Sequence, residues 1–250
     1  MSRLVVLMYH RVAPDAAGPL AHLTVPPDRF AWQMARLRDD GFSPQTQENV
    51  RAWLAGRRAL PRKAVAVTLD DGYADNVTHA FPVLERLRIP AVTFIVTGKL
   101  GGMNDWDGDD APWPLMDAGA VRDWSRRGLE FGAHSRSHRT LVGLDEPTLR
   151  EEIAGSGDDL ARLTGREPLA FAYPFGHFDV RARQIASERF AISYSVRPGA
   201  NGDDADPHLL RRTAVLPAYP NFEFLCQLRL GWGPRARARF YARRLWRRAA

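Results

Sequence analysis

Short apolar runs recur along this chain of 250 residues, and each precedes a stretch with helical spacing. Four of these runs are 64–69 (AVAVTL), 91–96 (AVTFIV), 129–134 (LEFGAH) and 169–174 (LAFAYP). Runs of this length that are rich in apolar and β-branched residues are typical of strands buried on both faces. A strand followed by a helix, several times over, predicts βα units around a parallel sheet.

The helices expected after these runs cover 74–88, 120–128, 145–165 and 178–190. The third has an N-cap candidate in Asp145 and ends at Gly165, a common helix terminator. Because α/β barrels of about 250 residues fold as single domains, we expect one domain over 1–233 and a tail over 234–250.

Residues 5–12 (VVLMYHRV) form a further apolar run near the start of the chain. A secretory signal needs a charged start, about 7–15 apolar residues and a small-residue cleavage site, whereas this run stops at Tyr9 and continues as HRVAPD. We therefore expect a core strand with His10 at its end. Since nothing in the chain approaches the ~18 apolar residues of a membrane span, we expect no signal peptide and no transmembrane segment.

One long irregular segment, Gly98–Met116, interrupts the alternation of strands and helices. It is rich in Gly, Asp and Pro, and loops of this length in compact domains usually carry function. Its Trp106 and Trp113 suit stacking on sugar rings, and anchoring of the loop is the alternative. Trp106 is the predicted substrate contact.

Polar clusters follow three of the predicted strands. Asp70 and Asp71 come directly after the run 64–69 and before Gly72, where a turn lets both carboxylates line one end of the sheet. His134 and His138 are four residues apart, a spacing that places two imidazoles on the same side of a helical or tight turn. A solvated turn explains either pair alone, but together they predict a metal site.

The third cluster is AYPFG, 172–176, again at a strand end. Pro174 has a fixed φ and no N–H, so the loop is stiff and the Phe175 amide can be held toward the site. A fixed backbone donor beside a metal is what the oxyanion of an acyl transfer requires. Tyr173 and Pro174 are the other predicted substrate contacts.

The segments TLDDG, HSRSH and YPFG resemble the first three motifs of the polysaccharide deacetylases, carbohydrate esterase family four, with the nodulation-type deacetylase homology domain. The resemblance extends from LMYHRV to about LLRRTAV and covers most of the chain. It implies an α/β fold, a distorted (β/α) barrel of about seven strands. The implied reaction is hydrolysis of N-acetyl groups on an amino-sugar glycan or a lipid-linked oligosaccharide intermediate, with release of acetate.

Carried over position by position, the resemblance implies that Asp70 is the general base and Asp71 a metal ligand. It implies that His134 and His138 complete the metal set and that the Phe175 N–H stabilises the oxyanion. Three protein ligands leave coordination positions open, as a catalytic site requires. This ligand set suits zinc, and nickel, cobalt or iron would also fit it.

The chain departs from the family pattern at several places. Ala172 stands where the third motif commonly begins with an arginine that orients the base, and the fourth motif has no clear counterpart. The late strand that usually carries the general acid also lacks its histidine. Members that begin with MYHRV look circularly permuted, with the usual last strand placed first. His10 is then the predicted general acid, and His177 is the alternative.

The formal net charge of +6 comes from the end of the chain. Residues 235–250 contain seven arginines and no acid, so removing these seven leaves residues 1–234 at −1. On a helical wheel most of the tail's apolar residues gather on one side, a pattern typical of peripheral binding to an anionic membrane. Docking of the tail on the barrel or a solvated tail is the alternative, and nucleic-acid binding is disfavoured. The single Cys226 has no partner for an internal disulfide. We therefore expect a cytoplasmic protein at the inner face of the membrane.

Three other functions remain open at this level. An aspartyl-phosphate phosphatase would need Asp-x-Asp, and here the two acids are adjacent. A metal-dependent hydrolase of small non-sugar amides would use the same barrel. A catalytically degenerate glycan-binding module would keep the metal residues and lack turnover.

Overall fold

The structure, a computed structural model, describes the chain except for residues 1–2, 16–18, 107–112, 236 and 239–250. Its main feature is a parallel sheet in the order β10-β1-β5-β6-β7-β8-β9. These strands are β1 (Leu4–Tyr9), β5 (Ala64–Leu69), β6 (Val92–Ile95), β7 (Glu130–Ala133), β8 (Ala170–Ala172), β9 (Ile192–Tyr194) and β10 (Thr213–Ala214). The sheet curls into a partial barrel, so the prediction of a distorted (β/α) barrel of about seven strands is confirmed.

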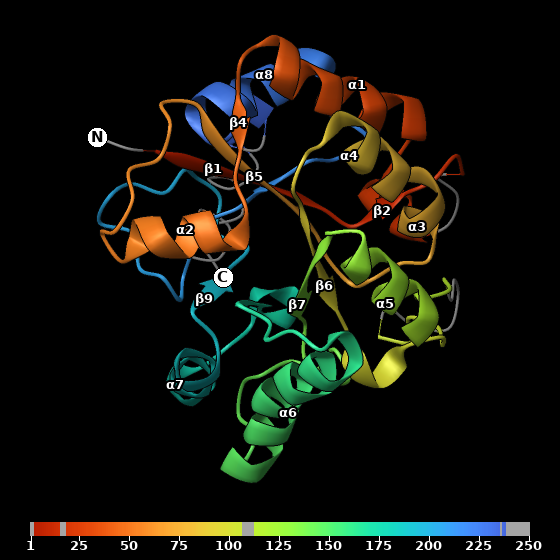
Figure 1. Cartoon of the computed structure of the whole chain (residues 1–250), viewed down its shortest axis with the longest axis vertical. Coiled ribbons are helices and arrows are strands. Elements are labelled where there is room, and N and C mark those ends of the chain that lie inside the picture. Colours follow the sequence, from red (N-terminus) through yellow and green to blue (C-terminus); the bar gives the residue numbers. More distant parts are fainter. Residues whose placement is uncertain (1–2, 16–18, 107–112, 236, 239–250) are drawn as a thin grey trace.

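Helices surround the outside of this sheet, and α1, α4, α5, α6 and α7 follow one another around it (Figure 1). The α-helices are α1 (Pro27–Asp39), α2 (Gln47–Leu54), α3 (Asp75–His79), α4 (Phe81–Leu87), α5 (Ala118–Arg126), α6 (Glu146–Thr164), α7 (Val180–Arg189) and α8 (Asn221–Leu230). Short 3-10 turns cover η1 (Pro19–Leu23), η2 (Thr97–Lys99) and η3 (Pro174–Gly176). The strand β4 (Ser43–Pro44) pairs with β5, and β2 (Arg11–Val12) pairs with β3 (Thr24–Val25).

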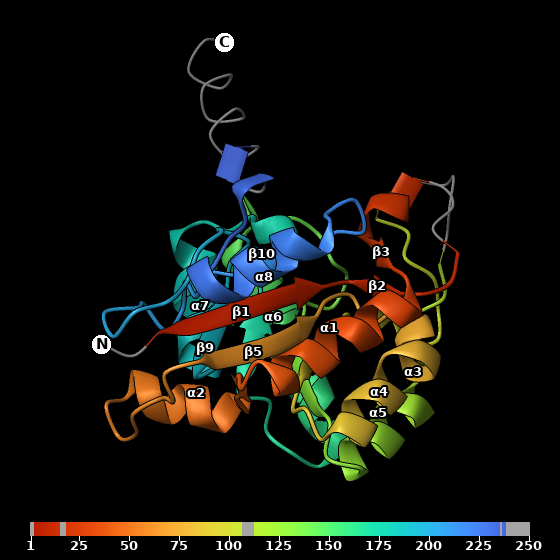
Figure 2. The same ribbon diagram turned by 90° about the horizontal axis from the view of Figure 1, so that it is seen from above.

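The early apolar run is the core strand β1, and all six of its residues are buried. It lies between β5 and β10, and Figure 2 shows β1 and β5 side by side in the same direction. Strand β1 therefore lies inside the sheet and not at its edge, and the prediction of a core strand over the run 5–12 is confirmed. Its C-terminal end leads directly to His10.

Helix α6 begins and ends as its sequence predicts. The Asp145 side chain accepts a hydrogen bond from the Thr148 N–H at 2.8 Å, and Gly165 closes the helix in the left-handed conformation. The helix expected over 74–88 is instead two helices that meet at Ala80. Pro82 lies in the first turn of α4, where its missing N–H costs no helical hydrogen bond. The prediction of one continuous helix was wrong for this reason.

The segment 207–212 runs beside β9 and leads into β10. Leu210 forms a parallel bridge with Tyr194, and the Ser195 N–H donates to the Leu210 carbonyl at 2.9 Å. This segment lays Arg212 across the inside of the barrel, where its side chain is completely buried.

Most of the predicted tail lies outside the described residues. Its first turn is anchored by Glu223, whose buried carboxylate accepts from the Arg235 N–H at 3.0 Å. In the described part of the chain, no helix is both long enough and apolar enough to cross a membrane.

Candidate active site and metal centre

The predicted polar residues meet where the strands end. His10 follows β1, Asp70 follows β5, His134 follows β7 and Pro174 lies just beyond β8. Because parallel strands present their carboxyl ends at one edge, these positions form a common mouth, as in other (β/α) barrels. A small cavity of about 80 Å³ opens there. Among the residues that line it are His10, Asp70, Asp71, His134, His138 and Phe175.

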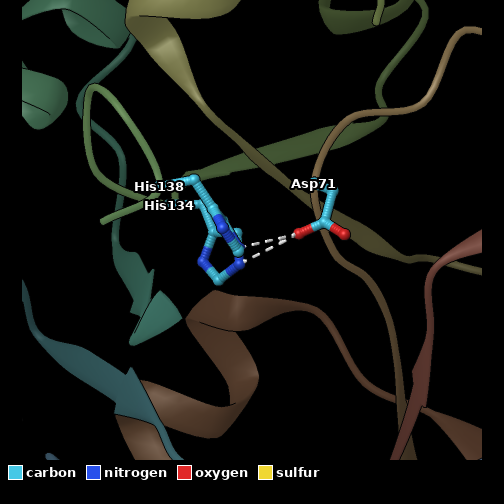
Figure 3. Close-up of side chains that lie close together, drawn as sticks. All are labelled: Asp71, His134 and His138. Carbon is cyan, nitrogen blue, oxygen red and sulfur yellow. Dashed lines mark ion pairs between the residues drawn. The ribbon is translucent and has the colours of Figure 1, made fainter. Parts of the chain in front are cut away.

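Asp71, His134 and His138 converge on one point (Figure 3). The Asp71 Oδ1 lies 3.2 Å from the His134 Nε2 and 3.3 Å from the His138 Nε2. All three side chains are buried, and their ligand atoms lie within 4.8 Å of one another. Two nitrogen donors and one carboxylate oxygen are the donor types that bind zinc and related divalent ions. The three residues therefore fit a divalent metal.

A second layer of contacts orients these ligands. The His134 Nδ1 lies 2.7 Å from the Ala172 carbonyl oxygen. The backbone N–H of His138 donates to the Ser135 Oγ at 3.0 Å. In the tautomer that donates from Nδ1, the His134 Nε2 presents its lone pair to the site, the usual arrangement of a metal-binding histidine. The position that lacks the family's arginine thus contributes a backbone carbonyl that holds a ligand.

The backbone at the ligands is strained. Asp71, Ser135 and His138 have φ values of 72°, 63° and 58°, although none is glycine. Such conformations cost of order 1–3 kcal/mol each and cluster at functional sites. Burial acts to raise the pKa of Asp71, but the two histidines hold that pKa well below its ordinary value. Asp71 is therefore ionised in the folded chain.

Aromatic rings enclose His138. The Trp106 ring stacks on it with centroids 4.2 Å apart, and the Phe175 ring meets it edge-on at 4.5 Å. Trp113 is buried instead, with the Arg11 guanidinium 3.0 Å from its ring centroid. In the segment 98–116, Trp113 is thus the anchor and Trp106 borders the cavity. Residues 107–112 of this segment lie outside the described residues.

Asp70 is held by a residue that the sequence did not reveal. The Arg212 guanidinium donates to both carboxylate oxygens of Asp70, at 2.6 and 2.8 Å, and both side chains are almost fully buried. Burial acts to raise the pKa of Asp70, but Arg212, with help from His134 and His10, holds it below its ordinary value. The motif position of Ala172 supplies no arginine, and Arg212, from a distant part of the chain, makes the contact with Asp70 instead.

His10 and Phe175 border the same cavity from the ends of β1 and β8. Asn76 fixes the backbone around His10, because its Nδ2 donates to the His10 carbonyl at 2.8 Å and its Oδ1 accepts from the Val12 N–H at 3.0 Å. Phe175 has a left-handed backbone with φ 56°, and within the described chain no backbone carbonyl accepts its N–H. Phe175 thus lies at the mouth, and its N–H makes no backbone hydrogen bond among the described residues.

Two other predicted residues lie differently. Tyr173 borders the cavity but is fully buried, with its ring stacked on Phe178 and its hydroxyl donating to the His208 carbonyl at 3.3 Å. His177 lies beyond Phe175, and their ring centroids are 5.9 Å apart. Among the described residues that line the cavity, His10 is present and His177 is not.

The structure is thus a (β/α) barrel with three groups at one mouth. They are a set of three side chains that could bind a metal, an aspartate paired with an arginine, and a backbone amide without a backbone acceptor among the described residues. The family model for polysaccharide deacetylases matches residues 57–189, more than half of the chain. The chain belongs to the polysaccharide deacetylase family.

Individual relatives agree with this assignment. YxkH of Bacillus subtilis (strain 168), whose name marks its polysaccharide deacetylase activity as inferred, is 24% identical over 224 residues, which are 89% of this chain and 75% of YxkH. The poly-beta-1,6-N-acetyl-D-glucosamine N-deacetylase of Staphylococcus aureus (strain MSSA476) is 25% identical over 61% of this chain, and this chain spans 59% of that enzyme. The structure of IcaB from Ammonifex degensii superposes with a TM-score of 0.75 at 26% identity and covers 92% of this chain and 97% of IcaB.

Proposed function

We propose that this protein is a metal-dependent deacetylase that hydrolyses N-acetyl groups of an amino-sugar glycan and releases acetate. The observation that carries the proposal is the convergence of Asp71, His134 and His138 beside an Asp70 that Arg212 holds ionised. Family membership supports the deacetylase class. The metal, the glycan and the role of each residue are parts of the proposal.

The metal would be held by Asp71, His134 and His138, and zinc is the ion that we propose, with nickel, cobalt or iron as alternatives. A divalent ion in such a site supplies Lewis acidity toward the amide carbonyl and lowers the pKa of water. Burial of all three ligands and stacking of Trp106 on His138 restrict the access of bulk water to this point.

Asp70 is proposed to take the proton from the attacking water. Its two hydrogen bonds to Arg212 fix the orientation of the carboxylate and keep it ionised over a wide pH range. They also make it a weak base, so the water must be acidified by its surroundings. General base assistance of this kind contributes about 10²–10⁴-fold.

His10 and Phe175 are proposed to serve the other half of the reaction. An amine leaves poorly unless it is protonated. His10 lines the cavity from the end of β1, the strand next to β5, and is proposed to donate that proton. The Phe175 N–H is proposed to stabilise the oxyanion, a contribution of about 3–4 kcal/mol in comparable sites. Trp106 remains a proposed substrate contact, and Tyr173 and Pro174, which are buried, are proposed to support the wall of the site.

The name of the S. aureus relative supports a polymer of N-acetylglucosamine as the substrate class. A lipid-linked or soluble oligosaccharide intermediate fits the same chemistry. Peripheral association with an anionic membrane through the tail, at the cytoplasmic face, stays a proposal, because most of that tail lies outside the described residues.

The test is acetate release by the purified protein from N-acetylglucosamine oligomers and from a panel of small amides, with bound metal quantified in the same sample. We expect stoichiometric metal, acetate release from the oligomers and loss of both after chelation. Preference for the small amides would instead assign a non-sugar amidase. Bound metal without acetate release from any glycan would assign a glycan-binding module.

A further inference from the structure

A second cleft lies at the opposite end of the sheet from the metal centre. It has a volume of about 420 Å³ and opens where β1 and β5 begin, next to the end of α8. Figure 2 shows both strands starting on the side of the N-terminus and pointing away from it. The cleft therefore lies one strand length, roughly 20 Å, from the mouth that carries Asp70 and the metal ligands.

Four cationic side chains line this cleft: Arg3, Arg62, Lys63 and Arg229. Its one carboxylate, Asp40, already forms an ion pair with Arg36. Within the described residues none of the four cations forms a salt bridge, whereas many other exposed arginines do, such as Arg126 with Asp123 at 3.1 Å. An uncompensated charge of about four thus gathers in one concave place on a body whose net charge is close to zero.

Apolar side chains form part of the cleft wall, where Val5 and Leu228 are buried, and others are exposed beside it. Its walls include Val5, Phe42 and Leu228, and α8 packs against β1 through the buried side of the helix. On the outer side of α8, Phe222 and Leu230 are 52% and 58% exposed. Phe222 and Arg229 are seven residues apart, two helical turns, so they lie on one face of α8. Large apolar side chains are thus presented to solvent directly beside the cations.

We propose that this cleft and the outer face of α8 dock the protein on a membrane surface rich in anionic phospholipids. The cleft cations would contact headgroup phosphates, and Phe222 and Leu230 would enter the interfacial layer. A soluble phosphate would satisfy the cations but would leave the exposed apolar side chains of α8 without a partner. Cations beside protruding aromatic and leucine side chains are the combination that binds an anionic lipid interface.

This docking would give the enzyme a defined orientation. With the beginnings of β1 and β5 against the lipid, the mouth at their ends points away from the surface. A glycan that extends from the membrane or passes in solution can then reach the metal centre. The docking surface shares no residue with that centre, so the proposal stands or falls independently of the deacetylase chemistry.

The experiment is vesicle flotation of the full chain at about 0.1 M salt, where charges are screened beyond about 10 Å. Vesicles of phosphatidylcholine alone are compared with vesicles that also contain phosphatidylglycerol. The cleft variant Arg62→Gln/Lys63→Gln/Arg229→Gln should bind the anionic vesicles roughly 100-fold more weakly than the unmodified chain, because each basic residue near such a surface contributes about fivefold. The variant Phe222→Ser/Leu230→Ser should weaken binding even where added salt screens the charges.

A matched control is Arg86→Gln/Arg122→Gln/Arg166→Gln, since these three arginines are exposed and form no salt bridge among the described residues, but are scattered. It removes the same charge and should bind within about threefold of the unmodified chain. All variants keep the tail, so any binding by the tail cancels. Soluble-substrate turnover should be unchanged in the cleft variant.

Equal losses in the cleft and control variants would mean general electrostatic attraction and would overturn the proposal. Undiminished binding by the cleft variant would also overturn it. If inorganic phosphate raises the Tm of the unmodified chain but not of the cleft variant, while the vesicles bind neither, the cleft takes soluble phosphate and the membrane assignment is wrong.

Discussion

Asp70, which is buried, and Glu130, which is half-buried, are carboxylic acids at opposite ends of the same sheet, yet their pKa values move in opposite directions. Asp70 follows β5 at the mouth, where burial favours the neutral acid but Arg212 holds the pKa below its ordinary value. Glu130 begins β7 at the other end, where burial raises its pKa to about 7. Its carboxylate accepts from the Gln47 N–H at 3.0 Å, and within the described residues it forms no salt bridge.

The difference shows what decides the charge of an enclosed acid in this protein. Burial disfavours ionisation at both ends. A guanidinium in direct two-point contact outweighs burial, whereas a single backbone amide does not. The mouth thus keeps Asp70 and Asp71 ionised, and the opposite end tolerates a neutral acid.

The largest expected effect concerns the ionised groups of the mouth. The double variant His134→Ala/His138→Ala should lose stoichiometric metal and all measurable deacetylation, because only Asp71 of the three ligands remains. Asp70→Asn should keep the metal and lose at least ~10² in kcat, since a neutral amide cannot accept the proton. Metal analysis by mass spectrometry with acetate assays measures both. Full metal content in the double variant would refute the site.

The next effect separates the two candidate acids. His10→Ala should bind metal normally and lower kcat by roughly 10²–10⁴, because the amine must leave without a proton donor. His177→Ala is the matched control and should lower kcat less than about threefold. A folded, metal-loaded His10→Ala protein with near-normal kcat would move the acid role to His177 or to water.

Much of the framework was accessible from local sequence. The runs 64–69 and 5–12 are buried strands because apolar and β-branched residues fill both of their faces. Asp71 and His134 were predicted to meet because they lie just after β5 and β7, and parallel strands bring such positions together. His138 was added through its spacing of four residues from His134. In these cases a short segment contains both the structural and the chemical signal.

Arg212 could not be found in this way. It is 142 residues from Asp70, next to a strand of only two residues, in a segment with a second arginine beside it. Nothing local distinguishes Arg212, which is buried, from Arg211, which is exposed. Helix α2 was likewise not predicted, although it places Gln47 against Glu130. Pairings between distant segments depend on how the sheet closes, and that information is absent from any short stretch.

Removing the guanidinium should make Asp70 resemble Glu130. Arg212→Met would leave a buried acid without its partner, and breaking such a pair costs about 3–5 kcal/mol of unfolding free energy. In the unmodified chain the pair's contribution is present above the unfolded pKa of about 4 and is lost as the pH falls below it. In the variant the pKa of Asp70 rises, so stability should instead fall as the pH rises above about 4.

Urea unfolding across this pH range measures the effect on metal-free protein. Arg211→Met is the control, because the exposed Arg211 side chain makes one weak hydrogen bond, to the Pro198 carbonyl at 3.3 Å. Its cost should stay within about 0.5 kcal/mol. An equal loss of unfolding free energy in Arg212→Met and Arg211→Met would show that the ion pair between Arg212 and Asp70 does not stabilise the fold.

The smallest effect tests the other side of the comparison. The folded pKa of Glu130, about 7, lies above the ordinary value of 4.5. The folded state therefore binds the extra proton between these values, and the stability that the neutral acid provides is present below about 4.5 and lost as the pH rises through 7.

Glu130→Gln should remove this loss, because the amide oxygen still accepts from the Gln47 N–H and carries no charge. Relative to the unmodified chain, the variant should gain about 1–3 kcal/mol of unfolding free energy at pH 8 and almost nothing at pH 4.5. Glu167→Gln, an exposed acid paired with Arg189 at 2.9 Å, is the control and should shift stability by less than about 0.5 kcal/mol at either pH. A gain of the same size at both pH values would show that packing, and not ionisation, separates Glu130 from Asp70.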